Sequence, residues 1–301
     1  MTSRPTTARK PRPKRWWLLA LAVLVVVAGV LAYGYVESYR IEVKQFTFTS
    51  PDVPSGFDGT RIVLLTDIHR AAFFSQGRVG RLVERVNALQ PDLVVLGGDY
   101  VYANADYEAS CFAELAHLQA PLGRFAVLGN HDYGEYDDGN RNGDVDPTVA
   151  IDAIRGAGIT PLDNQAVWVE KAGTRIRVGG VGDLTEDMPQ VAPTLEGTDA
   201  GDFVLLVSHN PDYAEELPIG AVDLMLAGHT HGGQVTFFGL WAPYLPSEYG
   251  QKYRTGLVVT EATTVIVSNG IGTIFPPIRF FARPQIVEIT LRTGPSALLH
   301  P

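Results

Sequence analysis

Residues 222–234 read VDLMLAGHTHGGQ, and the fold is organised around this stretch. Its apolar half, residues 222–227, is typical of a buried strand, and His229 and His231 follow where that strand ends. In open α/β sheets, binding sites are built at the carboxyl ends of the strands. Neutral imidazole is the commonest metal ligand in proteins, and glycine lets the backbone pass close to an ion. The stretch therefore predicts a metal site, with an ordinary pair of surface or core histidines as the alternative.

Four further apolar runs end in polar groups of the same kind. They are residues 61–66 before Asp67 and His69, residues 91–96 before Asp99, residues 123–128 before Asn130, His131 and Asp132, and residues 203–207 before His209. A single polar residue after a strand is also common in turns, which is the structural alternative for each of them. Five of the seven histidines nevertheless follow predicted strands, and this repetition favours one shared site.

The spacing of apolar residues between these strands indicates how the strands are connected. It predicts helices over residues 77–89, 107–118 and 148–156. Strands that alternate with helices form a largely parallel sheet, so their carboxyl ends meet in space. Nitrogen and oxygen donors gathered there, without sulfur, fit two divalent metal ions and suit Mn, Fe or Zn. Further strands are predicted at residues 41–48, 166–170, 174–181, 264–268 and 285–291.

The composition is that of a packed globular protein, with 46% hydrophobic and 19% charged residues. Cys111 is the only cysteine, which excludes an internal disulfide and a thiolate metal cage, and we expect it to be a small buried residue. Six of the 24 basic residues and none of the 33 acidic residues lie within residues 1–36. The remainder is therefore more acidic than the net charge of −9 indicates, which argues against binding to nucleic acid.

The N-terminal segment predicts a membrane anchor. Residues 1–15 are basic and rich in Pro and Thr, and we interpret them as a cytoplasmic tail. Residues 16–36 carry no charge and as a helix would span roughly 30 Å, the thickness of a bilayer core. The positive-inside rule then places residues 37–301 on the extracytoplasmic side of a bacterial cell membrane, with a single pass. A cleaved signal peptide is the alternative, but the apolar run is long for one.

The chain resembles the calcineurin-like metallophosphoesterase family in five ordered motifs: Asp67-x-His69, Gly98-Asp99, Gly129-Asn130-His131-Asp132, Ser208-His209 and Gly228-His229-x-His231. The resemblance covers about residues 60–290, and residues 268–272 and 276–279 are similar to the bacterial membrane-linked branch of the family. Some members of that branch hydrolyse glycolipid or UDP-2,3-diacylglucosamine-type phosphoesters. The resemblance implies an α/β fold, a four-layer αββα sandwich of mixed sheets over residues 37–295, preceded by one transmembrane helix.

The family also implies roles for individual residues of this sequence. One divalent ion would be held by Asp67, His69 and His231, the other by Asn130, His209 and His229, and Asp99 would bridge the two. His131 would assist the leaving oxygen, and Asp132 would orient His131. A hydroxide held between the ions would then attack phosphorus in line, because bound metals acidify water and neutralise developing charge.

The expected activity is hydrolysis of a phosphoester at the membrane surface. The apolar loop at residues 237–245 and the short spacer after the anchor favour an amphiphilic, lipid-linked substrate, unless the aromatic residues of the loop only cover the sheet. A nucleotide phosphodiesterase with a soluble substrate, or a protein phosphatase, is the main alternative. A non-catalytic scaffold stabilised by metal is a weaker alternative, because every expected ligand is present.

Overall fold

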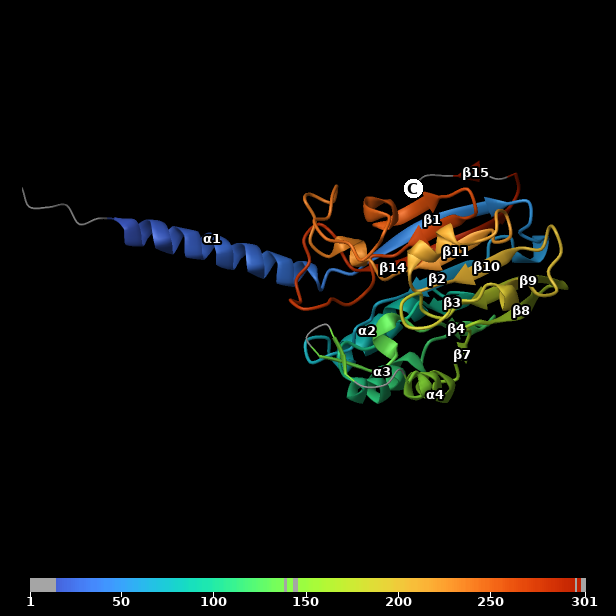
Figure 1. The fold of residues 1–301 in the computed structure, drawn as a ribbon, viewed down its shortest axis with the longest axis horizontal. Coiled ribbons are helices and arrows are strands. Elements are labelled where there is room, and N and C mark those ends of the chain that lie inside the picture. Colours follow the sequence, from blue (N-terminus) through green and yellow to red (C-terminus); the bar gives the residue numbers. More distant parts are fainter. Residues whose placement is uncertain (1–14, 138–139, 143–145, 296, 299–301) are drawn as a thin grey trace, which may run out of the picture.

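Two β-sheets packed face to face form the body of the protein, and one long helix projects from it (Figure 1). The fold is that of a computed structural model, which describes residues 15–137, 140–142, 146–295 and 297–298. The predicted tail therefore lies almost entirely outside the described residues. The mixed α/β fold with two sheets, expected from the resemblance, is confirmed.

The first sheet has the strand order β15-β1-β14-β2-β3-β4-β7. Its strands are β1 (Glu42–Ser50), β2 (Arg61–Leu65), β3 (Leu93–Leu96), β4 (Arg124–Ala126), β7 (Thr160–Pro161), β14 (Gln285–Thr293) and β15 (Ala297–Leu298). Strands β2, β3, β4 and β7 are parallel, whereas β14 is antiparallel to β2 and parallel to β1. Its outer face is covered by α2 (Gln76–Ala88), α3 (Glu108–Leu115) and α4 (Thr148–Gly156) (Figure 1).

The second sheet has the strand order β12-β13-β11-β10-β9-β8. Its strands are β8 (Gln165–Lys171), β9 (Thr174–Gly180), β10 (Val204–Val207), β11 (Leu224–Ala227), β12 (Gly256–Val259) and β13 (Thr264–Val267). The four central strands are parallel, and the edge strands β8 and β12 are antiparallel to their neighbours. The outer face is covered by short helices: α5 (Ala192–Leu195), η4 (Pro211–Glu215) and η6 (Gly250–Tyr253). The fourth layer of the expected sandwich is therefore made of single helical turns and loops.

Alternating residues of β2 serve two different cores. Ile62 and Leu64 face the second sheet, while Val63 and Leu65 pack against the layer of helices. Strands buried on both faces read as continuous apolar runs, which is why the sequence displayed them so clearly. In α2, Val79 and Leu82 are among the apolar residues that face the same helical core, as their spacing predicted.

The projecting helix α1 spans Trp16–Glu37. It is long and apolar enough to cross a membrane, and Gly34 and Glu37 are its only buried residues. Its last turn is fixed to the domain, because the backbone N–H of Arg279 donates to the carbonyl of Gly34 at 2.9 Å. A Cβ on Gly34 would lie 2.6 Å from Cε2 of Phe280, so a larger residue would require the Phe280 ring to move.

Some elements differ from the sequence-based expectation. The helix expected over residues 107–118 is shortened to α3, preceded by the 3₁₀ turn η2 (Ala105–Tyr107). The long loop after residue 132 contains a small hairpin, β5 (Glu135–Asp137) and β6 (Asn140–Asn142), with residues 138–139 and 143–145 outside the described part. Cys111 is fully buried, as expected.

Candidate metal centre

Every predicted site residue lies just after the carboxyl end of a parallel strand. Asp67 and His69 follow β2, Asp99 follows β3, His209 follows β10, and His229 and His231 follow β11. Asn130, His131 and Asp132 form the 3₁₀ turn η3 (Asn130–Asp132) after β4, and His231 begins the turn η5 (His231–Gly233). Both sheets therefore contribute to one site, at a shared edge of the sandwich.

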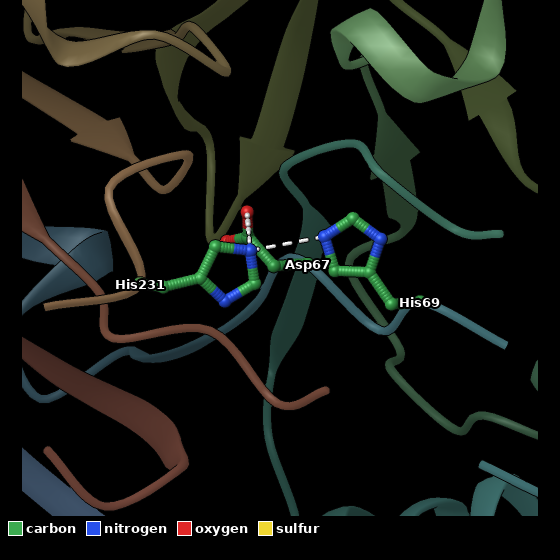
Figure 2. Close-up of side chains that lie close together, drawn as sticks. All are labelled: Asp67, His69 and His231. Carbon is green, nitrogen blue, oxygen red and sulfur yellow. Dashed lines mark hydrogen bonds and ion pairs between the residues drawn. The ribbon is translucent and has the colours of Figure 1, made fainter. Parts of the chain in front are cut away.

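Asp67, His69 and His231 form the first cluster, shown in Figure 2. Nε2 of His231 lies 3.0 Å from Nε2 of His69 and 3.4 Å from Oδ1 of Asp67. All three residues are buried, and their ligand atoms lie within 4.8 Å of one another. This is the spacing of side chains that share one ion.

Asp99 connects the first cluster to a second one. Its Oδ2 atom lies 3.4 Å from Nε2 of His69 and 3.3 Å from Nε2 of His209. Nε2 of His209 in turn lies 3.2 Å from Nδ1 of His229. Oδ1 of Asn130, which lines the adjacent cavity, is buried and has no hydrogen-bond partner among the described residues. A single carboxylate oxygen therefore lies between two groups of nitrogen donors.

The donor atoms fit a cation better than they fit one another. Nδ1 of His69 lies 3.3 Å from the carbonyl of Val101, and Nδ1 of His209 lies 2.7 Å from the carbonyl of Gly97. A carbonyl only accepts, so each Nδ1 carries the proton and each Nε2 presents a lone pair to the site. Such a hydrogen bond on the far nitrogen is how proteins orient a metal-binding histidine. Oδ1 of Asn130, unpartnered among the described residues, is a further electron-pair donor of this kind. Divalent ions would coordinate these imidazole nitrogens and this oxygen.

Burial keeps most of the imidazoles neutral, which is the form that binds metal. It lowers the pKa of His69 to about 3 and that of His229 to about 4. Burial also raises the pKa of Asp67 to about 6. His209 differs, because the neighbouring Asp99 overcomes the effect of burial and raises its pKa well above the usual value. The carboxylate of Asp99 therefore favours positive charge at the Nε2 side of His209.

The backbone at the site is strained. Asp67, His69, Asp99, His229 and His231 all have φ between +47° and +67°. Residues with a Cβ rarely adopt such angles, each costs about 1–3 kcal/mol, and they gather at functional sites. The surrounding structure must hold these turns in place for a purpose other than stability.

Glycines make room for the ligands. A Cβ on Gly228 would lie 2.1 Å from Oγ1 of Thr66 and 2.5 Å from Oδ2 of Asp67. A Cβ on Gly129 would lie 2.3 Å from Oδ1 of Asp99. The glycines of the sequence motifs are therefore required by the close approach of neighbouring loops.

Asp132 supports the Asp99 turn. Its carboxylate accepts hydrogen bonds from the backbone N–H groups of Asp99 (2.7 Å), Tyr100 (2.9 Å) and Gly129 (2.8 Å). The sequence expectation was that Asp132 orients His131. That role stays a prediction. The three contacts show that Asp132 also fixes the backbone that carries Asp99, so we treat Asp132 as a positioning residue.

Sequence reasoning missed two residues that hold the ligands. The Thr66 hydroxyl donates to Oδ2 of Asp67 at 2.8 Å. Arg279 is fully buried, and its guanidinium donates to the carbonyls of His231, Asn269, Gly272 and Ala282. Its Nη2 atom also lies 3.2 Å from Nδ1 of His231. In the sequence, residues 276–279 show only a similarity to the membrane-linked branch, which does not indicate this role.

A cavity of about 300 Å³ opens onto the centre. Its polar wall includes Asp99, Asn130 and His131, and its apolar wall includes Tyr244 and Ile274. The His131 ring stands edge-on to that of His69, with 5.0 Å between their centroids, and its backbone N–H donates to Oδ1 of Asp99 at 2.9 Å. A substrate in this cavity would contact the donor clusters, His131 and an apolar surface at once.

Comparison with known proteins agrees with this geometry. Residues 60–233, which include all nine predicted site residues, match the family model described as calcineurin-like phosphoesterase. The uncharacterized metallophosphoesterase YkuE of Bacillus subtilis is 32% identical over 282 residues, covering 91% of this chain and 94% of that protein. The phosphodiesterase YaeI of Escherichia coli is 30% identical over 232 residues, covering 77% of this chain and 82% of that protein. A transmembrane protein with metallophosphoesterase domain from Danio rerio is 28% identical, covering 89% of this chain and 62% of that protein.

Proposed function

Because the chain belongs to the calcineurin-like phosphoesterase family, whose members hydrolyse phosphoesters and bind two divalent metal ions, we propose that it is a membrane-anchored phosphodiesterase that acts on lipid-linked phosphoesters. The observation that carries the proposal is the cavity at the metal centre, in which the donor clusters face an apolar wall.

Within this proposal, each predicted ligand has a defined task. Asp67, His69 and His231 would hold one ion, Asn130, His209 and His229 would hold the other, and Asp99 would contribute to both. The 3.3 and 3.4 Å distances from Oδ2 of Asp99 to one histidine of each set support the bridging role. Mixed imidazole, amide and carboxylate donors suit Mn, Fe or Zn.

The chemistry combines metal ions with residues of the chain. The ions, when bound, acidify water and neutralise the charge that develops on the phosphoryl oxygens. His131 lies on the cavity wall, where its ring can donate a hydrogen bond or a proton to the leaving oxygen. Asp132 and Thr66 hold Asp99 and Asp67 in position, so their effect on catalysis is indirect.

The location of the cavity supports an amphiphilic substrate. Tyr244 and Ile274 of its apolar wall belong to two loops near the last turn of α1. We propose that α1 crosses a bacterial cell membrane once, with its N-terminus in the cytoplasm. The cavity would then open close to the extracytoplasmic surface of that membrane. A phosphoester whose lipid tail stays in the bilayer would reach the centre there.

Hydrolysis assays on the purified full-length protein test this proposal. We expect bis-p-nitrophenyl phosphate to be hydrolysed faster than the p-nitrophenyl monoester when Mn, Fe or Zn is added singly. Asp99→Asn should abolish both activities with the fold retained, whereas Asp152→Asn, an exposed carboxylate on α4, should have no effect. Normal turnover by Asp99→Asn would refute the bridging assignment.

Substrate competition separates the proposed substrate from its alternatives. A diacylated sugar nucleotide in mixed micelles, a soluble nucleotide phosphodiester and a phosphopeptide are compared by kcat/KM. We expect the diacylated compound to be preferred by at least tenfold. Preference for the nucleotide or the phosphopeptide would instead identify a phosphodiesterase or a protein phosphatase with a soluble substrate.

A further inference from the structure

Two loops beside α1 carry large apolar side chains that remain exposed. We call this set the aromatic rim, and it consists of Phe237, Phe238, Leu240, Trp241, Tyr244 and Phe275. Their exposed fractions range from 49% to 81%. The side chains of the loop at residues 237–245 therefore do more than cover the sheet, because about half or more of each named side chain stays exposed.

The aromatic rim is continuous with the end of α1. The Tyr33 ring lies 5.8 Å from that of Phe280 and 6.1 Å from that of Phe281, and Phe281 in turn lies 5.3 Å from Phe238, measured between centroids. In Figure 1, the orange and red loops of these segments lie at the end of the domain from which α1 projects. The last turn of the helix and the rim therefore lie side by side.

The exposure of the remainder of α1 indicates that the aromatic rim lies against lipid. From Trp16 to Tyr33, the residues of the helix are exposed around its whole circumference. An apolar helix that is exposed over most of its length is suited to a lipid environment. Tyr33 and Tyr35 near its end lie where aromatic residues meet the membrane–water interface. Because the aromatic rim adjoins Tyr33, it would lie at the depth of this interface too.

The energetics favour insertion of the rim. Burying a large apolar side chain that would otherwise contact water is favourable, because it removes apolar surface from water. Phe237 and Trp241 stack on each other at 5.6 Å between centroids, yet 59% and 49% of their surface stays exposed. An exposed apolar patch of this kind marks an interaction site.

We propose that the aromatic rim inserts into the surface of the bilayer that α1 crosses, to a depth of about 5–10 Å. This inference rests on the membrane anchoring in the proposed function, but it is independent of the substrate. Tyr244 belongs both to the rim and to the wall of the metal-centre cavity. Insertion therefore places the cavity opening at the level of the lipid headgroups, without any movement of the domain.

Spin labels on the full-length protein in lipid vesicles test the proposal. Cys111 is fully buried, so an added cysteine is labelled selectively. Leu240→Cys reports on the rim, where Leu240 is 81% exposed. Ile219→Cys is the matched control: Ile219 is 78% exposed, but it precedes β11, at the opposite end of the strand from His229. Val26→Cys reports on the middle of α1.

The readout is the collision rate of each nitroxide with oxygen, which concentrates in lipid, relative to a water-soluble nickel chelate. The vesicles consist of phosphatidylethanolamine and phosphatidylglycerol. We expect the ratio of oxygen collisions to nickel-chelate collisions to be more than tenfold higher at positions 26 and 240 than at position 219. Equal values at 240 and 219, with a lipid-like value at 26, would overturn the insertion of the rim and leave the anchor intact. A water-like value at 26 would overturn the anchor and this inference together.

Discussion

Replacing Arg279 with lysine tests how strongly one buried side chain holds the metal-centre loops. The guanidinium donates to four carbonyl groups, those of His231, Asn269, Gly272 and Ala282, at distances of 2.6–3.1 Å. Burial lowers the pKa of Arg279 to about 10, so the side chain is still charged at neutral pH. Arg279→Lys keeps the charge and changes only the geometry of the donors.

The expected loss follows from the number of carbonyls that lysine cannot reach. An ammonium group has three donors at a single point, whereas the guanidinium has five in a planar fork. We expect about two of the four carbonyls to lose their donor, and each buried unsatisfied acceptor costs about 1–3 kcal/mol. The predicted loss is therefore about 2–6 kcal/mol, a large part of the 5–15 kcal/mol typical of a folded domain.

Urea unfolding of the full-length protein in detergent, followed by tryptophan fluorescence, measures this loss. Arg283→Lys is the matched control, because Arg283 lies on the same segment but is 43% exposed and pairs with Glu42 at 3.8 Å. We expect the control to change stability by less than about 0.5 kcal/mol. If the two variants have the same stability, the hydrogen bonds from the buried Arg279 guanidinium do not stabilise the metal-centre loops as argued.

Three further predictions concern the metal centre and the pH dependence. Gly228→Ala should remove bound metal while secondary structure is retained, because its Cβ would meet Thr66 and Asp67; metal content by mass spectrometry and circular dichroism check this. Since burial raises the pKa of Asp67 to about 6, protonation of this carboxylate should weaken metal binding as the pH falls below 6, as titration calorimetry can measure. Burial raises the pKa of Glu108 to about 7, so the folded state binds its proton more tightly than the unfolded state, and stability is lost as the pH rises from about 4.5 to 7. Glu108→Gln should therefore raise the melting temperature at pH 8 and not at pH 4, whereas the exposed Glu84→Gln should change neither.

The sequence predicted the centre of the fold well because burial there is two-sided. Strands such as β2 and β11 pack on both faces, so their apolar runs were uninterrupted and their carboxyl ends were easily located. Ligands placed directly after such strands could be assigned to one edge without knowledge of side-chain positions. Their assignment to individual ions came from the resemblance and stays a prediction.

Other features depend on contacts that are distant in sequence. Strand β1 pairs in parallel with β14, so that Glu42 lies opposite Gln285, and no local pattern indicates such a partner. The edge strand β12 is four residues long and only partly buried, so its periodicity is too weak to detect. The outer layer of the second sheet consists of single helical turns, which are too short to show helical spacing.

The supporting residues of the centre were hidden for a similar reason. Arg279 looks like an ordinary surface cation in the sequence, and its burial follows only from the way the 272–282 segment folds back over His231. Asp132 stands beside His131 in sequence, which favoured a direct partnership. Two of its three hydrogen bonds go to the Asp99 turn, which is over 30 positions away.

If α1 crosses a membrane as proposed, the contact between Gly34 and Arg279 couples the tilt of the helix to the domain. A helix of 22 residues is about 33 Å long, slightly more than the thickness of an average hydrocarbon core, so α1 would lean to fit. Because its final turn is fastened to the body through backbone and side-chain contacts, any lean is transferred to the whole domain. Thinner and thicker lipid mixtures should therefore rotate the catalytic cavity relative to the bilayer plane, making acyl-chain length itself a regulator of turnover.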